Sequence, residues 1–506
     1  MTITTPHTIT RTVGHFIDGN LHTDTESEAI ERRAPGTNEI VTRVIAGGTR
    51  EVESAVAAAR RAFDHGPWTK TTGMERAILL NRVADLIDAN ASRLAVLDAE
   101  ESGKPIVLAE GDIAGAAGLW RYAAALALNM QGKTFSNNGP DYTGIVLREP
   151  IGVVGLIIPW NFPALILSQK LPFALAAGCT TIVKPSEFTS SSALELVKLI
   201  AEAGFPAGVV NLVAGDGRAG QAISESNGID LVSFTGSTAT GRRVVAASAG
   251  NMKKLSLELG GKAANIVFAD ADLEDAAAGV VFGVNFNNGE CCVSQPRLLV
   301  QASVADEFVA EVARRNAYVK VGQPLDRGSD VGALIHAAHL DRVVSYVEGA
   351  AQYGANVVSG GERLTGGEFG DGQFIRPGII DNVRADSPAF RDEIFGPILT
   401  VTRFSTAEEA IALANGVEYG LANSVWSKNA DTLLDTAKAL KSGTVYANTT
   451  IDAPPQMPFG GYKASGVGRE MGEAGFEEFT ELKSISIRTG KRSATFGIPA
   501  ALGTMS

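Results

Sequence analysis

Short apolar runs alternate with longer amphipathic stretches through most of this chain. From residue 148 to 213 the pattern predicts strands at 151–158, 180–183 and 209–213, and helices at about 164–177 and 191–203. Strands that alternate with helices in this way are typical of a parallel sheet with crossover helices. A further strand is predicted at 230–234, with a helix starting near Arg242, and the alternation continues from 262 to about 448. That second region is long enough for a second α/β domain.

The first part of the chain has a mostly helical pattern. Short strands are predicted at 15–19 and 34–37, followed by helices at 51–63 and 74–89 and by alanine-rich helical sequence to about residue 131. The apolar residues of 74–89 recur with a period near 3.6, so we expect these helices to serve packing. A last short strand is expected at 484–488.

Length, composition and charge limit the class of protein. With 506 residues, 45% of them hydrophobic, the chain is expected to be globular with two or three domains. Its net charge of −12 argues against a nucleic-acid or membrane partner, which would favour a basic surface. The most apolar segment, 151–167, is too short to span a membrane comfortably. Three cysteines cannot form a disulfide framework, so a reducing compartment, the cytoplasm, is expected.

The sequence FNNGECC at 286–292 places two adjacent thiols in a glycine-bearing turn after an apolar run. A thiolate attacks carbonyl carbon well, so Cys291 or Cys292 is a candidate nucleophile, provided that a base lies near it. The alternative is a pair of buried, inert cysteines. His336 and His339 lack a third metal ligand, so no metal site is expected and we interpret both as surface histidines.

A better candidate for the base is Glu258, a single acid between two leucines and directly before a Gly-Gly turn. Burial raises the pKa of a carboxyl toward neutrality and makes it usable as a general base. The alternative is an edge-strand acid that faces water.

Two glycine-rich turns follow predicted strands and are candidates for a dinucleotide phosphate site. The turn at 215–220 matches G-x-G-x-x-G, but Asp216 is poorly placed for a phosphate and the match is weak. The turn at 236–241 is the better candidate, because its small hydroxyl residues precede a helix. Either one could be only a tight turn.

Lys184 and Glu187 follow the predicted strand 180–183, at the edge where open α/β sheets bind ligands. A lysine and a carboxylate there could bind the two hydroxyls of an adenosine ribose. The carboxylate would repel a 2′-phosphate, which favours NAD over NADP. A solvated pair that closes a helix start is the alternative.

Seven motifs together resemble the aldehyde dehydrogenase superfamily, in the family's order and from about Phe16 to Lys483. They are PWNFP at 159–163, KPSE at 184–187, FTGST at 234–238, LELGGK at 257–262, GECC at 289–292, EIFGP at 393–397 and PFGGYK at 458–463. The separation of Glu258 from the second cysteine also matches the family, and identifies Cys292 as the nucleophile.

The resemblance implies a catalytic role for five residues. Cys292 would attack an aldehyde, and the Asn161 amide with the Cys292 backbone N–H would hold the oxyanion. After hydride transfer to NAD, Glu258 would activate water to hydrolyse the thioester. Lys170 and Glu470 match positions that pass protons to and from that glutamate.

The resemblance also implies a set of cofactor contacts. Lys184 and Glu187 match the adenosine ribose side, Trp160 and Ser237 the diphosphate, and Glu393 with Phe395 the nicotinamide ribose. The turn at 215–220 becomes a neighbour of the adenine. The full set is Ile157, Trp160, Lys184, Glu187, Gly217, Gly220, Phe234, Gly236, Ser237, Glu393 and Phe395.

By family position, ten residues are expected to line an apolar aldehyde channel with some polar points. They are Phe162, Leu165, Ile166, Gln169, Phe286, Cys291, Val293, Ile451, Asp452 and Phe459. Gln169 replaces an aromatic residue common in relatives and indicates a roomier or more polar entrance. The set contains no lysine or arginine, which argues against an ω-carboxylated semialdehyde.

Two departures from the family pattern surround the nucleophile. Pro296 enters a segment that is usually flexible, so a stiffer loop is expected behind the thiol. Glu290 stands where glutamine is frequent, and its charge would raise the pKa of Cys292 if it turned inward. We therefore expect Glu290 to face solvent.

The fold implied by the resemblance has two Rossmann-like α/β domains and a small β arm. Residues 1–130 and 148–257 would bind NAD, 258–450 would carry the thiol, 131–147 with 476–492 would form an oligomerisation arm, and 493–506 would be a tail. A homodimer or homotetramer is expected, because a protruding ribbon needs a partner for its edge.

Other functions remain open at this stage. A CoA-acylating relative would not need the hydrolytic Glu258. A non-catalytic dinucleotide-binding or structural protein would not need Asn161, Glu258 and Cys292 together. A redox sensor that uses Cys291 and Cys292 is a further alternative.

Overall fold

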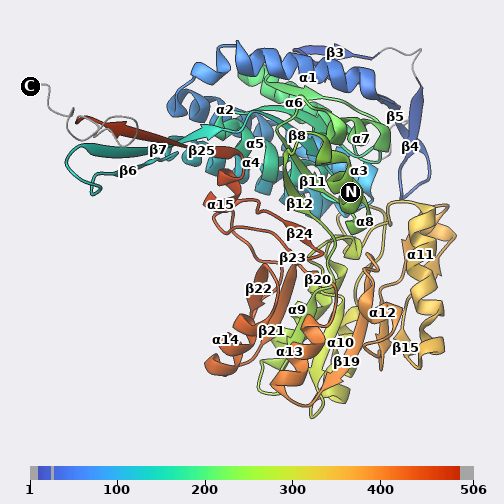
Figure 1. Cartoon of the computed structure of the whole chain (residues 1–506). Helices are drawn as coiled ribbons and strands as arrows, with labels where there is room; N and C mark the ends of the chain where they lie inside the picture. The colour runs from blue at the N-terminus through green and yellow to red at the C-terminus, as the bar shows by residue number, and fades with distance from the viewer. Residues whose placement is uncertain (1–9, 24–27, 491–506) are drawn as a thin grey trace, which may run out of the picture.

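The computed structural model describes residues 10–23 and 28–490, so the predicted tail at 493–506 lies outside the described residues. Two mixed sheets, each covered by helices, form the body of the molecule, and a long β ribbon leaves it (Figure 1). Among the described residues no helix is both long and apolar enough to cross a membrane.

The first sheet has eight strands and a parallel centre. Their order is β24 (Gly466–Val467), β12 (Lys254–Glu258), β11 (Leu231–Thr235), β8 (Val153–Ile157), β9 (Thr180–Lys184), β10 (Val210–Leu212), β2 (His15–Ile17) and β3 (Asn20–His22). The five strands from β12 to β10 run parallel, and the flanking strands are antiparallel. Their carboxyl ends therefore meet at one edge, where ligands bind in such sheets.

Helices cover both faces of this sheet. One core contains buried residues of α2 (Gly73–Ala89), α3 (Ala91–Ser102), α4 (Ile106–Leu128), α5 (Pro163–Ala177) and α6 (Ser191–Ala203). The other contains residues of α1 (Thr49–Asp64), α7 (Gly217–Glu225) and α8 (Thr238–Ala247). The strands between them are buried on both faces, which explains their continuous apolar runs.

The second sheet has seven strands and lies below the first in Figure 1. Their order is β15 (Asn356–Ser359), β18 (Gly378–Asp381), β19 (Ile398–Phe404), β14 (Arg297–Gln301), β13 (Ala264–Val267), β21 (Ala422–Trp426) and β22 (Thr444–Ala447), all parallel except β15. One core includes residues of α9 (Leu273–Asn285) and α10 (Ala305–Asn316), and the other includes residues of α11 (Ala337–Glu348) and α13 (Ala407–Asn415).

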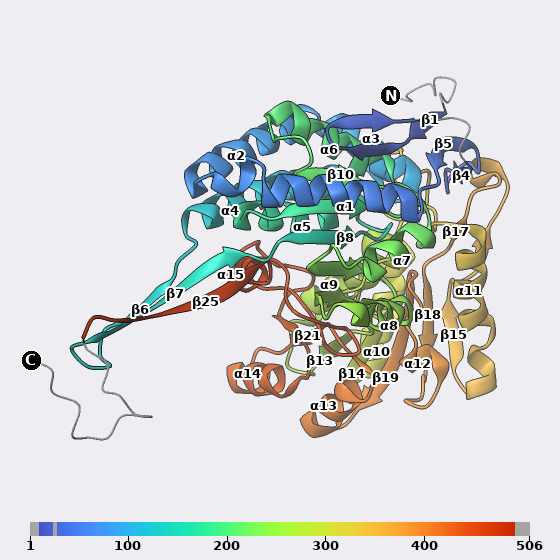
Figure 2. The same cartoon turned by 45° about the horizontal axis from the view of Figure 1, so that its top comes forward.

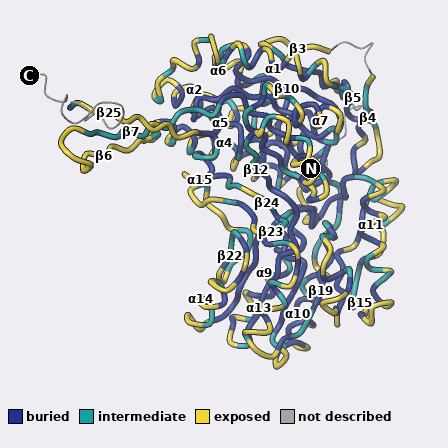
Figure 3. Tube along the Cα trace, in the orientation of Figure 1, coloured by how far each residue is buried: buried dark blue, intermediate teal, exposed yellow. Residues whose placement is uncertain are grey.

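The ribbon consists of three antiparallel strands. They are β25 (Thr480–Arg488), β7 (Tyr142–Pro150) and β6 (Lys133–Phe135), in that order. Figure 2 shows the ribbon extending away from the body, and Figure 3 shows that it is mostly exposed or half-buried. A small sheet of β1 (Arg11–Val13), β5 (Ile40–Ile45) and β4 (Ala29–Arg33) lies at the opposite side of the first sheet.

The strands and helices predicted between 151 and 234 occur within a few residues of their expected bounds, whereas the next helix starts earlier than expected. The helix expected near Arg242 begins at Thr238, because the Ser237 side chain accepts the Thr240 N–H at 3.2 Å and caps it. The strand predicted at 34–37 is wrong as well. These residues form a turn between β4 and β5, closed by a bond from the Asn38 N–H to the Ala34 carbonyl at 2.8 Å.

Candidate active site

The loop that carries the two cysteines is held in an unusual backbone conformation. After α9, Asn287 (φ 52°), Asn288 (φ 62°) and Gly289 (φ 71°) are all left-handed, which asparagine and glycine tolerate best. A Cβ on Gly289 would lie 2.2 Å from the Gly396 carbonyl carbon, so only glycine fits there. The buried Asn288 amide accepts the Gly332 N–H at 2.7 Å and donates to the Gly103 carbonyl. The loop is therefore fixed by contacts with distant segments.

Cys292 is partly accessible, whereas Cys291 is buried. A hydrogen bond with the Cys291 thiol raises the pKa of Cys292 well above its usual value, and burial and the Glu258 and Glu393 charges add to this effect. The neutral thiol is thus favoured, and attack on a carbonyl needs a base to take its proton. A Cβ on Gly261 would lie 2.2 Å from the Cys292 carbonyl oxygen, which places the Gly-Gly turn after Glu258 directly against the predicted nucleophile.

Asn161 lies in the loop between β8 and α5 and is buried. Its side-chain amide donates to the Glu290 carbonyl at 3.0 Å, and Asn287 donates to the Asn161 carbonyl at 3.1 Å. An amide nitrogen carries two hydrogens, so this bond aims the group and leaves one hydrogen for a ligand. The structure therefore brings the predicted oxyanion donor to the cysteine loop.

Glu258 ends β12, and both of its carboxyl oxygens are buried without a hydrogen-bond partner among the described residues. Burial raises the pKa of Glu258 well above its usual value, the charge of Glu470 raises it further, and Lys170 and Arg469 oppose them. β24 pairs along β12, so the alternative of an edge-strand acid facing water is wrong. An unpartnered carboxyl with a raised pKa is a poised base.

Lys170 and Glu470 lie beside Glu258 and are both buried. They form an ion pair, and the Lys170 ammonium also donates to Ser233 Oγ at 2.8 Å. The three predicted proton-handling side chains are thus brought together from a helix, a strand end and a late loop.

The adenosine-side residues lie at the carboxyl ends of β9 and β10. Lys184 is buried, and its ammonium lies 3.4 Å from the Glu187 carboxylate. Burial lowers the pKa of Lys184, and Glu187 and Asp216 raise it, so the turn at 215–220 is its neighbour. A Cβ on Gly217 would meet no atom within 4 Å, whereas one on Gly220 would approach Ile157 at 3.9 Å.

The phosphate turn after β11 leads directly into α8. A Cβ on Gly236 would lie 2.6 Å from the ring of Phe234, so the backbone passes closely over that side chain. Ser237 is exposed at the N-cap of α8. Exposed helix N-termini favour anions such as a diphosphate.

The residues predicted for the nicotinamide side also surround the Gly-Gly turn. Glu393 accepts the Gly261 N–H at 2.9 Å, and burial raises the pKa of Glu393 to about 7. Phe395 is left-handed (φ 64°), and its ring lies 5.5 Å from that of Trp160, edge to face. The geometry thus places a candidate cofactor surface beside Cys292.

Residues 22–485 match the family model of the aldehyde dehydrogenases. The chain belongs to the aldehyde dehydrogenase family. An aldehyde dehydrogenase from Emericella nidulans is 41% identical over 480 residues, covering 94% of this chain and 95% of the relative. An NAD-dependent aldehyde dehydrogenase structure from Sinorhizobium meliloti has 43% identity and a TM-score of 0.94, with 97% of each chain covered. The NAD+ complex of an aldehyde dehydrogenase from Bacillus cereus has 39% identity and a TM-score of 0.92, covering 95% and 97%. The predicted family and two-domain α/β fold are confirmed.

In this aldehyde dehydrogenase most of the predicted channel residues pack into one apolar cluster. This cluster is the core that also contains residues of α2 to α6, and it includes the buried Phe162, Ile166, Cys291 and Val293. Leu165, Phe286, Cys292, Ile451 and Phe459 are partly buried against the same cluster. The rings of Phe162 and Phe286 stack at 6.0 Å. Gln169 is half-buried, whereas Asp452 is exposed.

Tyr446 on β22 is a channel candidate that sequence reasoning missed. It is buried in the same cluster, and burial with the charges of Cys291, Cys292 and Asp452 raises the pKa of its phenol. A tyrosine in a strand carries no local signal of such a contact, because the contact depends on how the two sheets meet.

The expected exposure of Glu290 is wrong. Only 1% of the residue is accessible, and its carboxylate accepts the Ile335 N–H at 2.9 Å. Burial raises the pKa of Glu290, and this N–H bond, Asn288, Lys104 and Arg32 oppose that effect. The carboxyl is thus buried beside a backbone donor and within reach of two cations. His339 is buried too, so its assignment to the surface is also wrong, and no described group of three His, Cys, Asp or Glu side chains could hold a metal ion.

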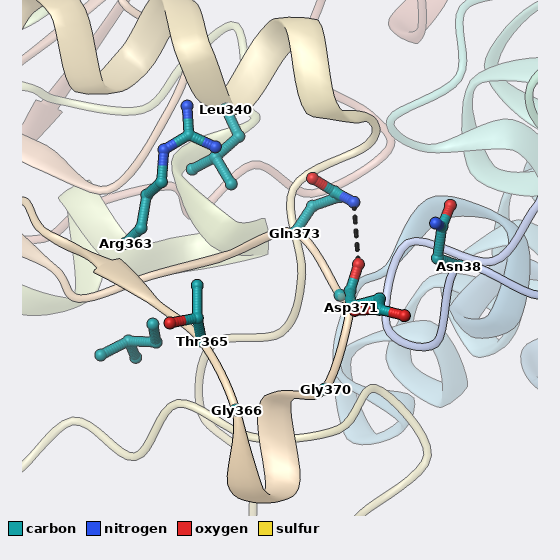
Figure 4. A pocket seen from close by; sticks show the side chains of 10 residues that line it. Asn38, Leu340, Arg363, Thr365, Gly366, Gly370, Asp371 and Gln373 are labelled. Atoms are coloured by element: carbon teal, nitrogen blue, oxygen red, sulfur yellow. Dashed lines mark hydrogen bonds between the residues drawn. The ribbon is translucent and has the colours of Figure 1, made fainter.

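A separate pocket of about 580 Å³ lies away from this site (Figure 4). Among the residues that line it are Asn38, Leu340, Arg363, Asp371 and Gln373. Arg363 pairs with Asp341, and the Gln373 amide donates to the Asp371 carbonyl, so two of its polar side chains already have partners. None of the predicted catalytic or cofactor residues lines this pocket.

Proposed function

We propose that this aldehyde dehydrogenase oxidises an aldehyde to the free carboxylic acid through a thioester on Cys292. The observation that supports this best is Glu258, a buried carboxyl that has no hydrogen-bond partner in the described part of the chain and whose charge acts on the Cys292 thiol. The family supplies the reaction class, NAD-dependent oxidation of an aldehyde.

The first step is addition of sulfur to the carbonyl carbon. The Cys292 proton leaves to a base as the C–S bond forms, and the carbonyl oxygen becomes an oxyanion. The second hydrogen of the Asn161 amide and the Cys292 backbone N–H are the donors for that oxygen. Since the first hydrogen is fixed on the Glu290 carbonyl, the donor is oriented before substrate arrives.

NAD, when bound, supplies the acceptor for the hydride that leaves the thiohemiacetal carbon. The residues present fit it: open space faces Gly217, Ser237 caps an exposed helix start, and Glu187 is available for ribose hydroxyls. Glu393 and Phe395 would hold the nicotinamide ribose. Between these contacts lie the ends of β8 and β11, with Ile157, Phe234 and Gly236.

The last step is hydrolysis of the thioester. Glu258 takes a proton from water as the oxygen attacks the acyl carbon, and the C–S bond breaks to release the acid and the thiol. Glu470 and Lys170 would carry the proton onward, because they lie beside Glu258 in the interior. A CoA-acylating relative would have no use for this base, which favours water as the acceptor.

The channel supports an uncharged or polar aldehyde as substrate. Its cluster is apolar, with Gln169 and Tyr446 as polar points, and Asp452 would disfavour an acidic substrate. Two domains divide the work in this proposal, the first sheet binding NAD and the second sheet carrying the thiol.

We also propose a cytoplasmic homodimer or homotetramer that uses the ribbon as its contact. β25 has exposed Leu482, Ile485 and Ile487, and within the described residues both outer strands of the ribbon are unpaired along one edge. An apolar edge of this kind is normally covered by a partner.

The test is formation of NADH from aliphatic, aromatic, amino- and carboxy-aldehydes, with NAD and with NADP, by wild type and by Cys292→Ala. Turnover with NAD that is lost in Cys292→Ala supports the proposal. Absence of turnover with every aldehyde, in a protein that still binds NAD, would contradict it. Light scattering of the same samples gives the oligomeric state.

A further inference from the structure

Glu290 fixes the cysteine loop (residues 286–292) through both its backbone and its side chain. Its carbonyl accepts the Asn161 and Asn287 amides, each at 3.0 Å. Its carboxylate accepts the Ile335 N–H at 2.9 Å, in the segment just before α11. Any movement of this side chain would therefore move the carbonyl that aims Asn161.

His339, on α11, continues the connection. Its Nε2 lies 2.7 Å from the Phe395 carbonyl and 3.6 Å from the Glu290 carboxylate. A carbonyl oxygen is only an acceptor, so Nε2 carries the hydrogen and donates it to Phe395. The distance to Glu290 is too long for a second hydrogen bond, and burial lowers the pKa of His339 to about 4, so the neutral imidazole packs against the Glu290 carboxyl without an ion pair.

Phe395 needs such a hold, because a left-handed backbone is unfavourable for a residue with a bulky side chain. The rings of Trp160, His339 and Phe395 also pack edge to face, with centroids 5.5–6.1 Å apart. Gly289 packs directly on Gly396 in the same region. The cysteine loop and the 393–397 segment are thus in direct contact, and His339 contacts the same segment at Phe395.

We propose that Glu290 and His339 are positioning residues that form one buried bridge between the oxyanion donor Asn161 and the nicotinamide-side residue Phe395. The identity of the two ends rests on the proposed function. Asn161 would hold the carbonyl group of the aldehyde, and Phe395 would lie against the nicotinamide. The bridge therefore fixes the position of the aldehyde carbon relative to the nicotinamide ring. Misplacement of reacting groups by about 1 Å can cost ~100-fold in rate, so hydride transfer is the step that depends on it.

Matched variants separate the bridge from general stability. Glu290→Ala and His339→Phe remove its donors and acceptors, and Phe retains an aromatic ring against Trp160. Glu290→Gln keeps the acceptor for Ile335, and His339→Gln keeps an N–H for Phe395. His336→Asn is the control, since His336 caps α11 by accepting the His339 N–H and Asn also caps helices.

The measurements are kcat, the KM for NAD and the isotope effect with a deuterated aldehyde. We expect kcat to fall ~10-fold in Glu290→Ala and in His339→Phe, with a larger isotope effect. The Gln variants should keep kcat within a few-fold of wild type. The double variant Glu290→Ala/His339→Phe should be no slower than the slower single variant, because one bridge is broken only once.

Two results would overturn the bridge: wild-type kcat and isotope effect in folded single variants, or a ~100-fold loss in the double variant. If wild type gives no NADH with any aldehyde, the proposed function fails separately. NADH binding, followed by its fluorescence, then tests the bridge alone: ~10-fold weaker binding in His339→Phe than in His336→Asn supports it, and equal binding contradicts it.

Discussion

Lys170 and Glu470 form a buried ion pair next to Glu258, although they lie 300 residues apart in the chain. Two opposite charges therefore act on one carboxyl. Glu470 raises the pKa of Glu258 and Lys170 lowers it, while burial has the largest effect. The pair sets how much of the base is ionised at a given pH.

Loss of Glu470 and loss of Lys170 should move the pH profile of kcat in opposite directions. A base acts only when ionised, so the acidic limb of kcat follows the pKa of Glu258. Glu470→Gln removes a negative charge, lowers that pKa and moves the limb to lower pH. Lys170→Met removes a positive charge, raises the pKa and moves the limb to higher pH, with kcat at neutral pH ~10-fold lower. Profiles that stay in place in both variants would show that the pair does not act on the rate-limiting base.

Alkylation of Cys292 should respond to Glu258 and not to Glu290. The charge of Glu258 contributes to the raised pKa of Cys292, so Glu258→Gln should lower the apparent pKa of alkylation and speed the reaction several-fold at neutral pH. Glu290→Gln is the matched control, because that carboxylate is directed toward Ile335, Lys104 and Arg32. The rate of alkylation by iodoacetamide, measured across pH for each variant, gives the apparent pKa and the rate at neutral pH. A large fall in Glu290→Gln would show that its charge does reach the sulfur.

Much of the fold was predictable, and Glu258 could be selected as a candidate, because these signals are local. Runs such as 153–157 (VVGLI) carry no polar side chain and are buried throughout, since both faces of the sheet are covered. Glu258 stood out as an acid between leucines. The predicted exposure of Glu290 was wrong for the opposite reason. An acid in a turn is expected to be exposed, but the groups that contact the Glu290 carboxyl are the Ile335 N–H and cations from distant parts of the chain. His339 and Tyr446 owe their burial to the packing between the sheets, which the chain pattern does not encode.

Two glycines give a matched test of close packing. Gly289→Ala should destabilise the protein by about 3 kcal/mol, because its Cβ would meet Gly396 and its φ is left-handed. Gly111→Ala, in the interior of α4 with nothing within 4 Å, should stabilise by about 0.5–1 kcal/mol. Thermal unfolding of both variants checks the signs. If Gly289→Ala leaves the free energy of unfolding unchanged, the cysteine loop can relax away from the 393–397 segment.

Cofactor choice should depend on Glu187. Its carboxylate lies 3.4 Å from the Lys184 ammonium at the end of β9, where it would accept from a ribose hydroxyl and repel a 2′-phosphate. Glu187→Gln keeps the size of the side chain and removes the charge, so the KM for NAD should rise ~10-fold while the kcat/KM for NADP improves. Glu195→Gln is the control, since it also removes one acidic charge but on α6, beside Arg93 and Lys198. If both variants shift the NADP to NAD ratio equally, the effect belongs to overall charge, and Glu187 is not the ribose contact.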